Sequence, residues 1–499
     1  MPLCSSPIPT MDFAAGTTAI FAKVKHTKLP ALTSTWSQIQ PELLYLCPSN
    51  SFIKISTIRN GRLRSKRRSL YLVRCSTKPD TDRAESLTDE NSHSNASLNS
   101  GMQEQEASAA NNKGSASNSS FSKGLVFGLG LQGSWDNAEI GSPVVKRYLG
   151  DEEERWYMWY HGSSKGNPSM DSIGLAVSSN GIHWERGEAT VKSSNDVGLT
   201  LNCSDDWWAF DTQGIRPCEV VIMSSTKVRA NNALYWLYYT GYNAEKVDSL
   251  DSSLQFNISN PEILNSGANS GAEGDIVSRI SKSLPGLAMS QDGRHWARIE
   301  GEHHSGALFD VGSKGEWDST FIASPQVVYH RAGDVRMYYH SFDVENGHFA
   351  VGMARSRDGI KWVKLGKIIG GGSKGMFDEL GVINAYIVKN KKDGKYVMAY
   401  EGVAGNGRRS IGMAVSDDGL KRWRKLQDWP VLMPSEEAGS WDAEGVGSPC
   451  LVQIEGDGAV DEWRLYYRGF DREGKTGIGL AVSHGCEFCL FQRWKGFHL

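Results

Sequence analysis

The feature that most constrains the fold of this chain is an internal repeat with five copies. Each copy opens with an aromatic residue followed by Asp, and a few residues later comes an apolar segment that Ser-Pro usually opens. An aromatic segment ending in a polar residue follows, and then a segment like the IGLAVS of 173–178. Such short units bury their apolar faces only by stacking on one another. The repeated aspartates are Asp136, Asp211, Asp318, Asp378 and Asp442.

Each copy predicts four antiparallel strands. Asn-Gly or Asp-Gly follows the third apolar segment in the first four copies, and this dipeptide favours a two-residue hairpin turn because both positions adopt positive φ. A fourth segment then carries a tryptophan in the same copies. Four strands in five copies predict an all-β fold, a five-bladed β-propeller over residues 123–499. The four tryptophans are Trp184, Trp296, Trp362 and Trp423.

The repeat is irregular at two places. The interval between Asp211 and Asp318 is the longest because it holds a Ser-, Asn- and Gly-rich segment over 243–283, which we expect to be a surface loop. The fifth copy has no clear tryptophan strand. The ring would therefore be closed either by an N-terminal strand from about Gly124 or by a C-terminal strand over 486–494.

The first 75 residues differ in composition from the rest. They contain eleven Lys or Arg against only two acids, with many Ser and Thr, which is typical of an organelle transit peptide. Val73-Arg74-Cys75 resembles a plastid processing site, which predicts a location in the chloroplast stroma. The rival interpretation of the basic cluster at 62–68 is a nucleic-acid patch. Residues 76–122 are polar with almost no large apolar groups, which predicts a disordered linker.

Charge and cysteine content narrow the class of partner. Without residues 1–75 the formal net charge goes from −3 to −12, which is unfavourable for nucleic acid or anionic membrane. No apolar run approaches the ~20 residues that span a bilayer, so we expect no integral membrane segment. The remaining cysteines are scattered, and no second pair accompanies Cys486 and Cys489 to complete a zinc site. We therefore predict no disulfide framework, no metal and no cofactor.

Strand direction predicts one functional end of the ring, where inner strands begin and second strands end. The repeated aspartates fall there, and one interpretation is structural: each caps backbone N–H groups as the chain enters a blade. The long segment after the second strand of the second copy would overhang the same mouth. Residues that differ between copies are better candidates for binding, and they are His161, Arg216, Glu219, His340, Asn384, Glu401 and Arg468.

The combined pattern resembles the arabinanase/levansucrase/invertase group of five-bladed glycosidases from Gly124 to about Trp494. It consists of aromatic-Asp, Ser-Pro-Val, an aromatic strand, and GLAVS followed by an Asx-Gly turn and Trp. The resemblance implies a carbohydrate ligand and three inner-strand acids, a base immediately before a proline and an acid two residues before one. Residues 141–143 read Gly-Ser-Pro here, and the other copies also lack a carboxylate at those places.

Two functions remain open. One is a glycoside hydrolase-like enzyme with relocated carboxylates, Glu401 as general acid and Asp136 or Asp318 as base, because glycoside cleavage needs two flanking carboxyl groups. The other is a non-catalytic propeller that binds a sugar or a protein partner in the plastid, and the missing acids favour it. Either way we expect a carbohydrate or small-molecule ligand in the central mouth. The expected binding residues are His161, Asp211, Arg216, His340, Asp378, Asn384, Asp442 and Arg468.

Overall fold

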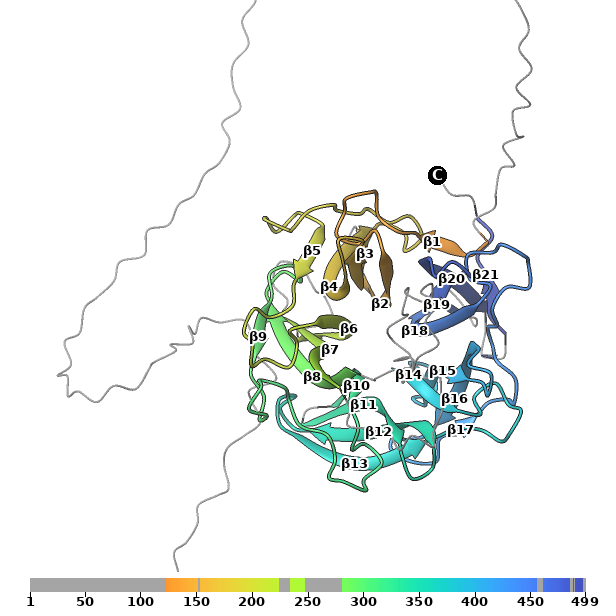
Figure 1. Ribbon diagram of the computed structural model, residues 1–499. Coiled ribbons are helices and arrows are strands. Elements are labelled where there is room, and N and C mark those ends of the chain that lie inside the picture. The colour runs from red at the N-terminus through yellow and green to blue at the C-terminus, as the bar shows by residue number, and fades with distance from the viewer. Residues whose placement is uncertain are drawn as a thin grey trace, which may run out of the picture. The chain divides into compact units, whose positions relative to one another are not determined.

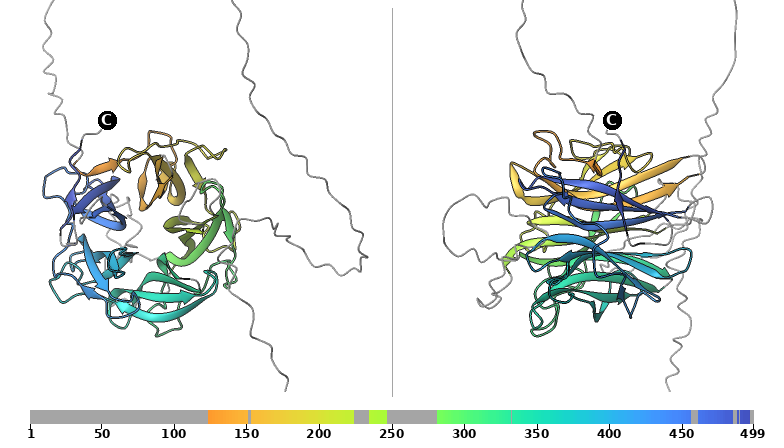
Figure 2. Two further views of the ribbon diagram at one scale, coloured as in Figure 1. Left: turned by 180° about the vertical axis from the view of Figure 1, so that it is seen from behind. Right: turned by 90° about the vertical axis from the view of Figure 1, so that its right-hand side faces the viewer.

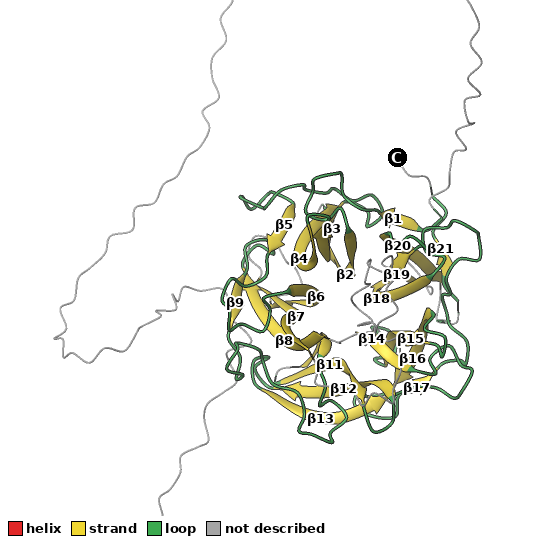
Figure 3. Ribbon diagram, viewed as in Figure 1, coloured by secondary structure: helices red, strands yellow, loops and turns green. Residues whose placement is uncertain are grey.

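In the computed structural model every regular element of the described residues is a strand, and these residues contain no helix (Figure 3). The all-β class that the repeats predict is thus confirmed. Among the described residues no helix is long and apolar enough to cross a membrane. The expected transit peptide, the expected linker, the Cys486–Cys489 pair and most of the expected loop lie outside the described part. The structure describes residues 123–150, 153–223, 234–246, 281–331, 333–455, 461–484, 488 and 490–496.

The strands form consecutive antiparallel sets arranged around a common axis (Figure 1). In each of the first four sets an inner strand pairs with a second strand, the second with a third, and the third with a short outer strand. The first two sets are β2 (Glu139–Leu149), β3 (Glu154–Ser164), β4 (Asn167–Ser178) and β5 (Gly198–Leu201), then β6 (Gly214–Met223), β7 (Leu234–Lys246), β8 (Ser281–Ser290) and β9 (Ala297–Ile299).

Strands β7 and β8 extend into both ends of the segment expected as a loop, so its bounds of 243–283 were too wide. The next two sets repeat the same order. They are β10 (Ala323–Arg331), β11 (Asp334–Asp343), β12 (His348–Ser356) and β13 (Trp362–Ile369), then β14 (Gly381–Lys389), β15 (Tyr396–Val403), β16 (Arg409–Ser416) and β17 (Arg424–Lys425).

The last set is completed from both directions of the chain. It contains β18 (Gly445–Ile454), β19 (Glu462–Phe470) and β20 (Thr476–His484). Strand β1 (Leu125–Phe127) pairs with β20 at Gly479, and β21 (Gln492–Arg493) pairs with it at Ala481. The two candidates for closure therefore share the edge of β20.

Neighbouring sets are held together by aromatic side chains. The tryptophan that follows each Asx-Gly turn packs against the second strand of the preceding set, as when Trp362 meets Tyr238 with ring centroids 6.0 Å apart. The Tyr238 hydroxyl also donates a hydrogen bond to the carbonyl of Gly359, whose φ is 79°. The turn here is wider than the predicted two-residue hairpin, because β12 and β13 are paired at Ser356 and Trp362 and Asp358 does not have positive φ. Trp184 of the first set meets Tyr466 of the last in the same way, so this packing runs around the whole ring.

Four of the five inner strands are bent near their start. Ser142, Ser324, Asn384 and Ser448 have φ between 45° and 51°, and the pairing with the second strand shifts register at each of them. This is the geometry of a β-bulge, which re-aims the side chains beside it. The strands run between two common ends of the ring (Figure 2). We call the end at which the inner strands begin the mouth.

Candidate functional site

A cluster of buried charges lies at the mouth, where the last set meets the first and second sets. The carboxylate of Glu139, at the start of β2, is 2.6 Å from Nη2 of Arg468 at the end of β19. Its Oε1 atom is also 3.4 Å from Nη2 of Arg216 and 3.4 Å from Nε2 of His161. Nε of Arg216 in turn lies 2.6 Å from Oδ2 of Asp171. We call these five residues the mouth cluster.

The surroundings of Glu139 and His161 keep the first ionised and the second neutral. Burial alone would raise the pKa of Glu139, but Arg468 and the hydrogen bond from His161 hold that pKa well below its ordinary value. Burial, together with the charge of Arg216, lowers the pKa of His161 to about 4. Nδ1 of His161 is buried and has no hydrogen-bond partner among the described residues. The cluster therefore presents an unused acceptor next to two guanidinium groups.

Gly141 keeps the space between two members of the cluster open. A Cβ atom at this position would lie 2.5 Å from Cδ of Arg468 and 2.8 Å from Cε1 of His161. Any side chain here would push Arg468 away from Glu139. The glycine that precedes Ser142-Pro143 is thus required by the close approach of the last set to the first.

Glu401, the expected general acid, is buried at the end of β15 with both carboxylate oxygens engaged. Its Oε2 accepts hydrogen bonds from Nδ2 of Asn384 and from the backbone nitrogen of Ser448, both at 2.8 Å. Its Oε1 is 3.3 Å from Nη1 of Arg409. Both oxygens of this carboxylate are therefore in contact with donor groups of the protein.

The side chains that end the second strands fasten one set to the next. Thr240 Oγ1 accepts a hydrogen bond from the backbone nitrogen of Ser324 at 2.9 Å, and His340 Nδ1 accepts one from that of Asn384 at 3.3 Å. Glu401 does the same for Ser448. Burial lowers the pKa of His340 to about 3, so its ring is neutral and can accept. Residues expected to bind a ligand therefore also join neighbouring sets.

The five repeated aspartates lie at the same end of the ring, and each makes its side-chain contacts within its own set. Each carboxylate accepts a hydrogen bond from a second-strand tyrosine and pairs with a Lys or Arg. In the third set Asp318 is 2.8 Å from the Tyr339 hydroxyl and 2.9 Å from Nζ of Lys364. The other four are Asp136 with Tyr160 and Arg186, Asp211 with Tyr239 and Arg298, Asp378 with Tyr400 and Lys425, and Asp442 with Tyr467 and Arg493.

The structure thus divides the expected site residues into two groups. It brings His161, Arg216 and Arg468 together around Glu139, and it joins Asn384 to Glu401. The hydrogen bonds and ion pairs of the aspartates run instead to tyrosines and cations, and not to Glu401. Their carboxylates accept from tyrosine hydroxyls, whereas one interpretation of the sequence expected them to cap backbone N–H groups. Asp136 and Asp318 are placed as inter-strand ties, which does not favour them as catalytic bases.

Three charged residues of the mouth were missed from the sequence, namely Glu139, Asp171 and Arg409. Glu139 stands four residues before Pro143, whereas the family pattern places its acids one and two residues before a proline. Glu139 could have been noticed in the sequence, because the inner strands of the third and fourth copies have no carboxylate at the same position. Asp171 and Arg409 lie on third strands, and nothing in the repeat singles them out.

Glu219, another candidate from the sequence, faces the axis below the mouth. Its carboxylate pairs with Lys146 and accepts a hydrogen bond from Nε2 of Gln326 at 2.7 Å. The axis is narrow at the Ser-Pro level, where the enclosed volume is only about 40 Å³, and it widens beyond Glu219 into a cavity of about 780 Å³. The wide part opens away from the mouth and is lined largely by Val, Ile and Leu.

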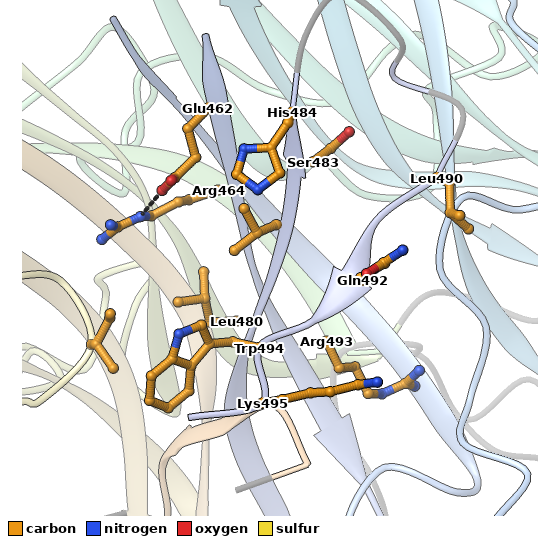
Figure 4. Close-up of a pocket in the computed structure, with 12 residues that line it drawn as sticks. Glu462, Arg464, Leu480, Ser483, His484, Leu490, Gln492, Arg493, Trp494 and Lys495 are labelled. Carbon is orange, nitrogen blue, oxygen red and sulfur yellow. Dashed lines mark hydrogen bonds and ion pairs between the residues drawn. The ribbon is translucent and has the colours of Figure 1, made fainter. Parts of the chain in front are cut away.

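A further pocket of about 620 Å³ lies at the edge of β20, away from the axis (Figure 4). Its wall includes Trp494 and the ion pair between Glu462 and Arg464, whose atoms are 2.6 Å apart. It contains none of the expected site residues. Within the described ranges no group of three or more His, Cys, Asp or Glu side chains is placed to hold a metal ion.

Comparison with known proteins gives distant structural likenesses only. No protein-family model matches the chain, and no curated protein matches it. One similar structure is that of a glycoside hydrolase, with 18% identity over 72% of this chain and 92% of the other and a TM-score of 0.46. A glycosyl hydrolase from Bacteroides ovatus has 15% identity over 71% and 90%, with a TM-score of 0.44.

A third similar structure comes from work on the GH130 family of mannoside phosphorylases, which contains glycoside hydrolases that target beta-1,2 mannosidic linkages in Candida mannan. It has 15% identity over 74% of this chain and 96% of the other, with a TM-score of 0.44. At these identities and TM-scores the likenesses carry no conclusion about the activity of this chain.

Proposed function

We propose that the described strand sets are the blades of a five-bladed β-propeller whose mouth binds a carbohydrate without cleaving it. The observation that carries this proposal is the set of contacts made by the two carboxylate oxygens of Glu401. Both of its oxygens are held by donors of the protein, so the expected proton donor is committed to Arg409, Asn384 and Ser448. Binding needs no free acid, whereas hydrolysis of a glycosidic bond does.

The chemistry of the mouth suits a polyhydroxylated ligand. Guanidinium groups donate and carboxylates accept in fixed directions, as hydroxyl recognition requires. Aromatic rings lie beside these groups, since the guanidinium carbon of Arg216 is 5.9 Å from the ring centroid of Tyr242 and that of Arg468 is 6.0 Å from Phe470. Polar groups next to apolar ring faces match the two kinds of surface that a sugar presents.

The second candidate function is a glycosidase in which Glu139, rather than Asp136 or Asp318, is the base for Glu401. It is favoured by one observation, namely that Arg468 contacts Glu139 and is paired in the sheet with Gly447, whose neighbour Ser448 donates to Glu401. Both carboxylates therefore lie near the same guanidinium group. Glu401 would have to leave Arg409 before it could donate a proton, which makes this the weaker candidate.

Binding is tested by titrating arabino-, xylo- and fructo-oligosaccharides into the protein in a calorimeter. We expect at least one series to bind, and Arg468→Lys to weaken that binding because a lysine cannot make the forked contact of a guanidinium group. Arg464→Lys, on the remote pocket at β20, is the matched control and should leave affinity unchanged. Equal loss in both variants, or no binding by the wild type, would contradict the proposal.

We also propose that residues 1–75 direct the protein to the chloroplast stroma and are then removed. The support is the basic, acid-poor composition that ends in Val73-Arg74-Cys75. N-terminal sequencing of the mature protein should begin near Ser76. A mature protein that begins at Met1, or a fluorescent fusion that stays in the cytosol, would refute this assignment.

A further inference from the structure

The turn that precedes each repeated aspartate is different in one of the five copies. In the other four a glycine stands three residues before the aspartate, with φ between 78° and 92°. No atom lies within 4 Å of the position that a Cβ would take on any of them, so these turns face open space. The four glycines are Gly133, Gly315, Gly375 and Gly439.

The second copy has a tryptophan at this position, Trp208, and another immediately before it, Trp207. Trp207 is 90% exposed and Trp208 is 42% exposed. Four copies form the turn with a glycine, so the fold does not require a large side chain there. Two adjacent exposed tryptophans are uncommon on a protein surface and indicate a contact with something outside the chain.

These tryptophans lie at the mouth end of the ring. Leu201, the last residue of β5, is paired with Ile173, and Ile173 is paired with His161 of the mouth cluster. The chain then crosses the mouth end from Asn202 to the start of β6. Arg298 of β9 fastens this crossing segment, since its Nη2 is 2.5 Å from the carbonyl oxygen of Asn202 and its Nε is 2.7 Å from Asp211.

The contacts of Arg298 place the crossing segment that begins at Asn202 over the outer edge of the second set. Arg216 of the mouth cluster is instead on the inner strand of that set. Strands β6 and β9 are three strand spacings apart, which is roughly 14 Å. A ligand that touches both Arg216 and Trp207 must therefore be a chain of several units and not a single sugar.

We propose that Trp207 and Trp208 form a stacking platform for the distal units of a neutral oligosaccharide whose other end occupies the mouth. This inference rests on the proposed function and names the ligand class more closely. The flat indole faces match the C–H faces of sugar rings, and the exposed carboxylates of Asp205 and Asp206 next to them accept hydrogen bonds from hydroxyl groups. Those two carboxylates disfavour a negatively charged sugar at this position.

A protein partner fits this surface less well than a sugar chain. A specific protein interface covers about 800 Å² on each partner and has a core poor in charged residues. Here the two indoles follow two aspartates and stand on a single turn. Continuity with the polar mouth cluster also favours a polar, extended ligand.

The test is a calorimetric titration of the full chain with a monosaccharide and with oligosaccharides of increasing length from the series that the wild type binds. Affinity of the wild type should rise with length until the chain reaches the platform. The double variant Trp207→Ala/Trp208→Ala should lose about tenfold or more in affinity for the longer oligosaccharides, because both stacking faces are removed. Its affinity for the monosaccharide should be unchanged.

Trp429→Ala is the matched control, because Trp429 is 65% exposed and lies between β17 and β18. It should bind every ligand as the wild type does. Affinity that does not depend on length, or an unchanged affinity of the double variant for long oligosaccharides, would overturn this inference while leaving the mouth intact. No binding of any sugar by the wild type would overturn the proposed function as well. If the wild type self-associates in sedimentation and the double variant does not, the two tryptophans bind another copy of the chain, and the inference is wrong.

Discussion

The Oε2 atom of Glu401 lies 2.8 Å from the backbone nitrogen of Ser448, so a side chain at the end of one strand set fixes the start of the inner strand of the next. Ser448 has a φ of 45°, and its inner strand is bent at this residue. The hydrogen bond thus satisfies a backbone N–H that the bend removes from the regular ladder. It makes Glu401 part of the joint between two sets.

The ion pair of Glu401 with Arg409 should contribute to stability. We expect Glu401→Gln to lower the free energy of unfolding by about 2–4 kcal/mol, because it removes a charge that faces the buried guanidinium group of Arg409. Arg409→Met in the same background should recover part of this loss. Urea unfolding of the two single variants and the double variant gives the interaction free energy between the side chains of Glu401 and Arg409. Strictly additive effects would show that the pair does not act as a unit.

The repeated aspartates should behave as structural residues. Asp318→Asn removes the charge that faces Lys364 and weakens the bond from the Tyr339 hydroxyl, so we expect a loss of about 1–3 kcal/mol in unfolding free energy. The exposed carboxylate Glu345 offers a control, since Glu345→Gln should change stability by less than about 0.5 kcal/mol. A variant Asp318→Asn as stable as the wild type would contradict this account.

Two glycines near the start of the described chain should respond differently to substitution. Gly141→Ala forces Arg468 and His161 apart, so we expect a loss of about 1–3 kcal/mol in stability together with weaker sugar binding. Gly128→Ala meets no atom within 4 Å and should be neutral. Thermal unfolding and titration of both variants provide the comparison, and equal behaviour of the two would refute the close contact at Gly141.

The two neutral histidines predict a loss of stability in mild acid. In the unfolded chain a histidine takes up a proton near its ordinary pKa of 6.5, whereas folding lowers the pKa of His161 to about 4 and that of His340 to about 3. Between those values the unfolded state binds more protons, so stability falls as pH falls. Each histidine should contribute a slope of about 1.4 kcal/mol per pH unit in this window.

The pH dependence is measured by urea unfolding between pH 7.5 and pH 4.5. Because His161→Gln removes one of the two buried rings, it should lower this slope by about 1.4 kcal/mol per pH unit. A wild-type stability that is constant down to pH 4.5 would show that these rings are not buried in the neutral form.

The sequence predicts the periodic part of this molecule well and its individual contacts poorly. The five copies indicate the strands, the Asx-Gly turns and the inter-set tryptophans, because all of these follow from local periodicity. The packing of Trp362 is confirmed in this way. The two-residue hairpin expected at Asp358-Gly359 is wrong, because residues 357–361 separate the paired Ser356 and Trp362 and only the glycine has positive φ. Contacts between sets, such as those of Glu139 with Arg468 and of Glu401 with Ser448, are not encoded by local periodicity.

Glu139 and Glu401 show most clearly which contacts could not be predicted from the sequence. The sequence singles out Glu401 as a polar residue at the end of its strand, but not the three donors that hold its carboxylate. Glu139 was missed because its partner Arg468 is 329 residues away and meets it only when the ring closes. Ring closure itself could not be assigned to one strand, since β1 and β21 share the edge of β20.

The central claim is that the mouth binds a sugar chain and leaves it intact. The most direct measurement incubates the protein with arabino-, xylo- and fructo-oligosaccharides at concentrations that saturate binding and follows the release of reducing sugar. We expect no release above the rate without protein, both for the wild type and for Glu401→Gln. Turnover by the wild type that falls about 10²–10⁴-fold in Glu401→Gln would contradict it and would identify Glu401 as a general acid.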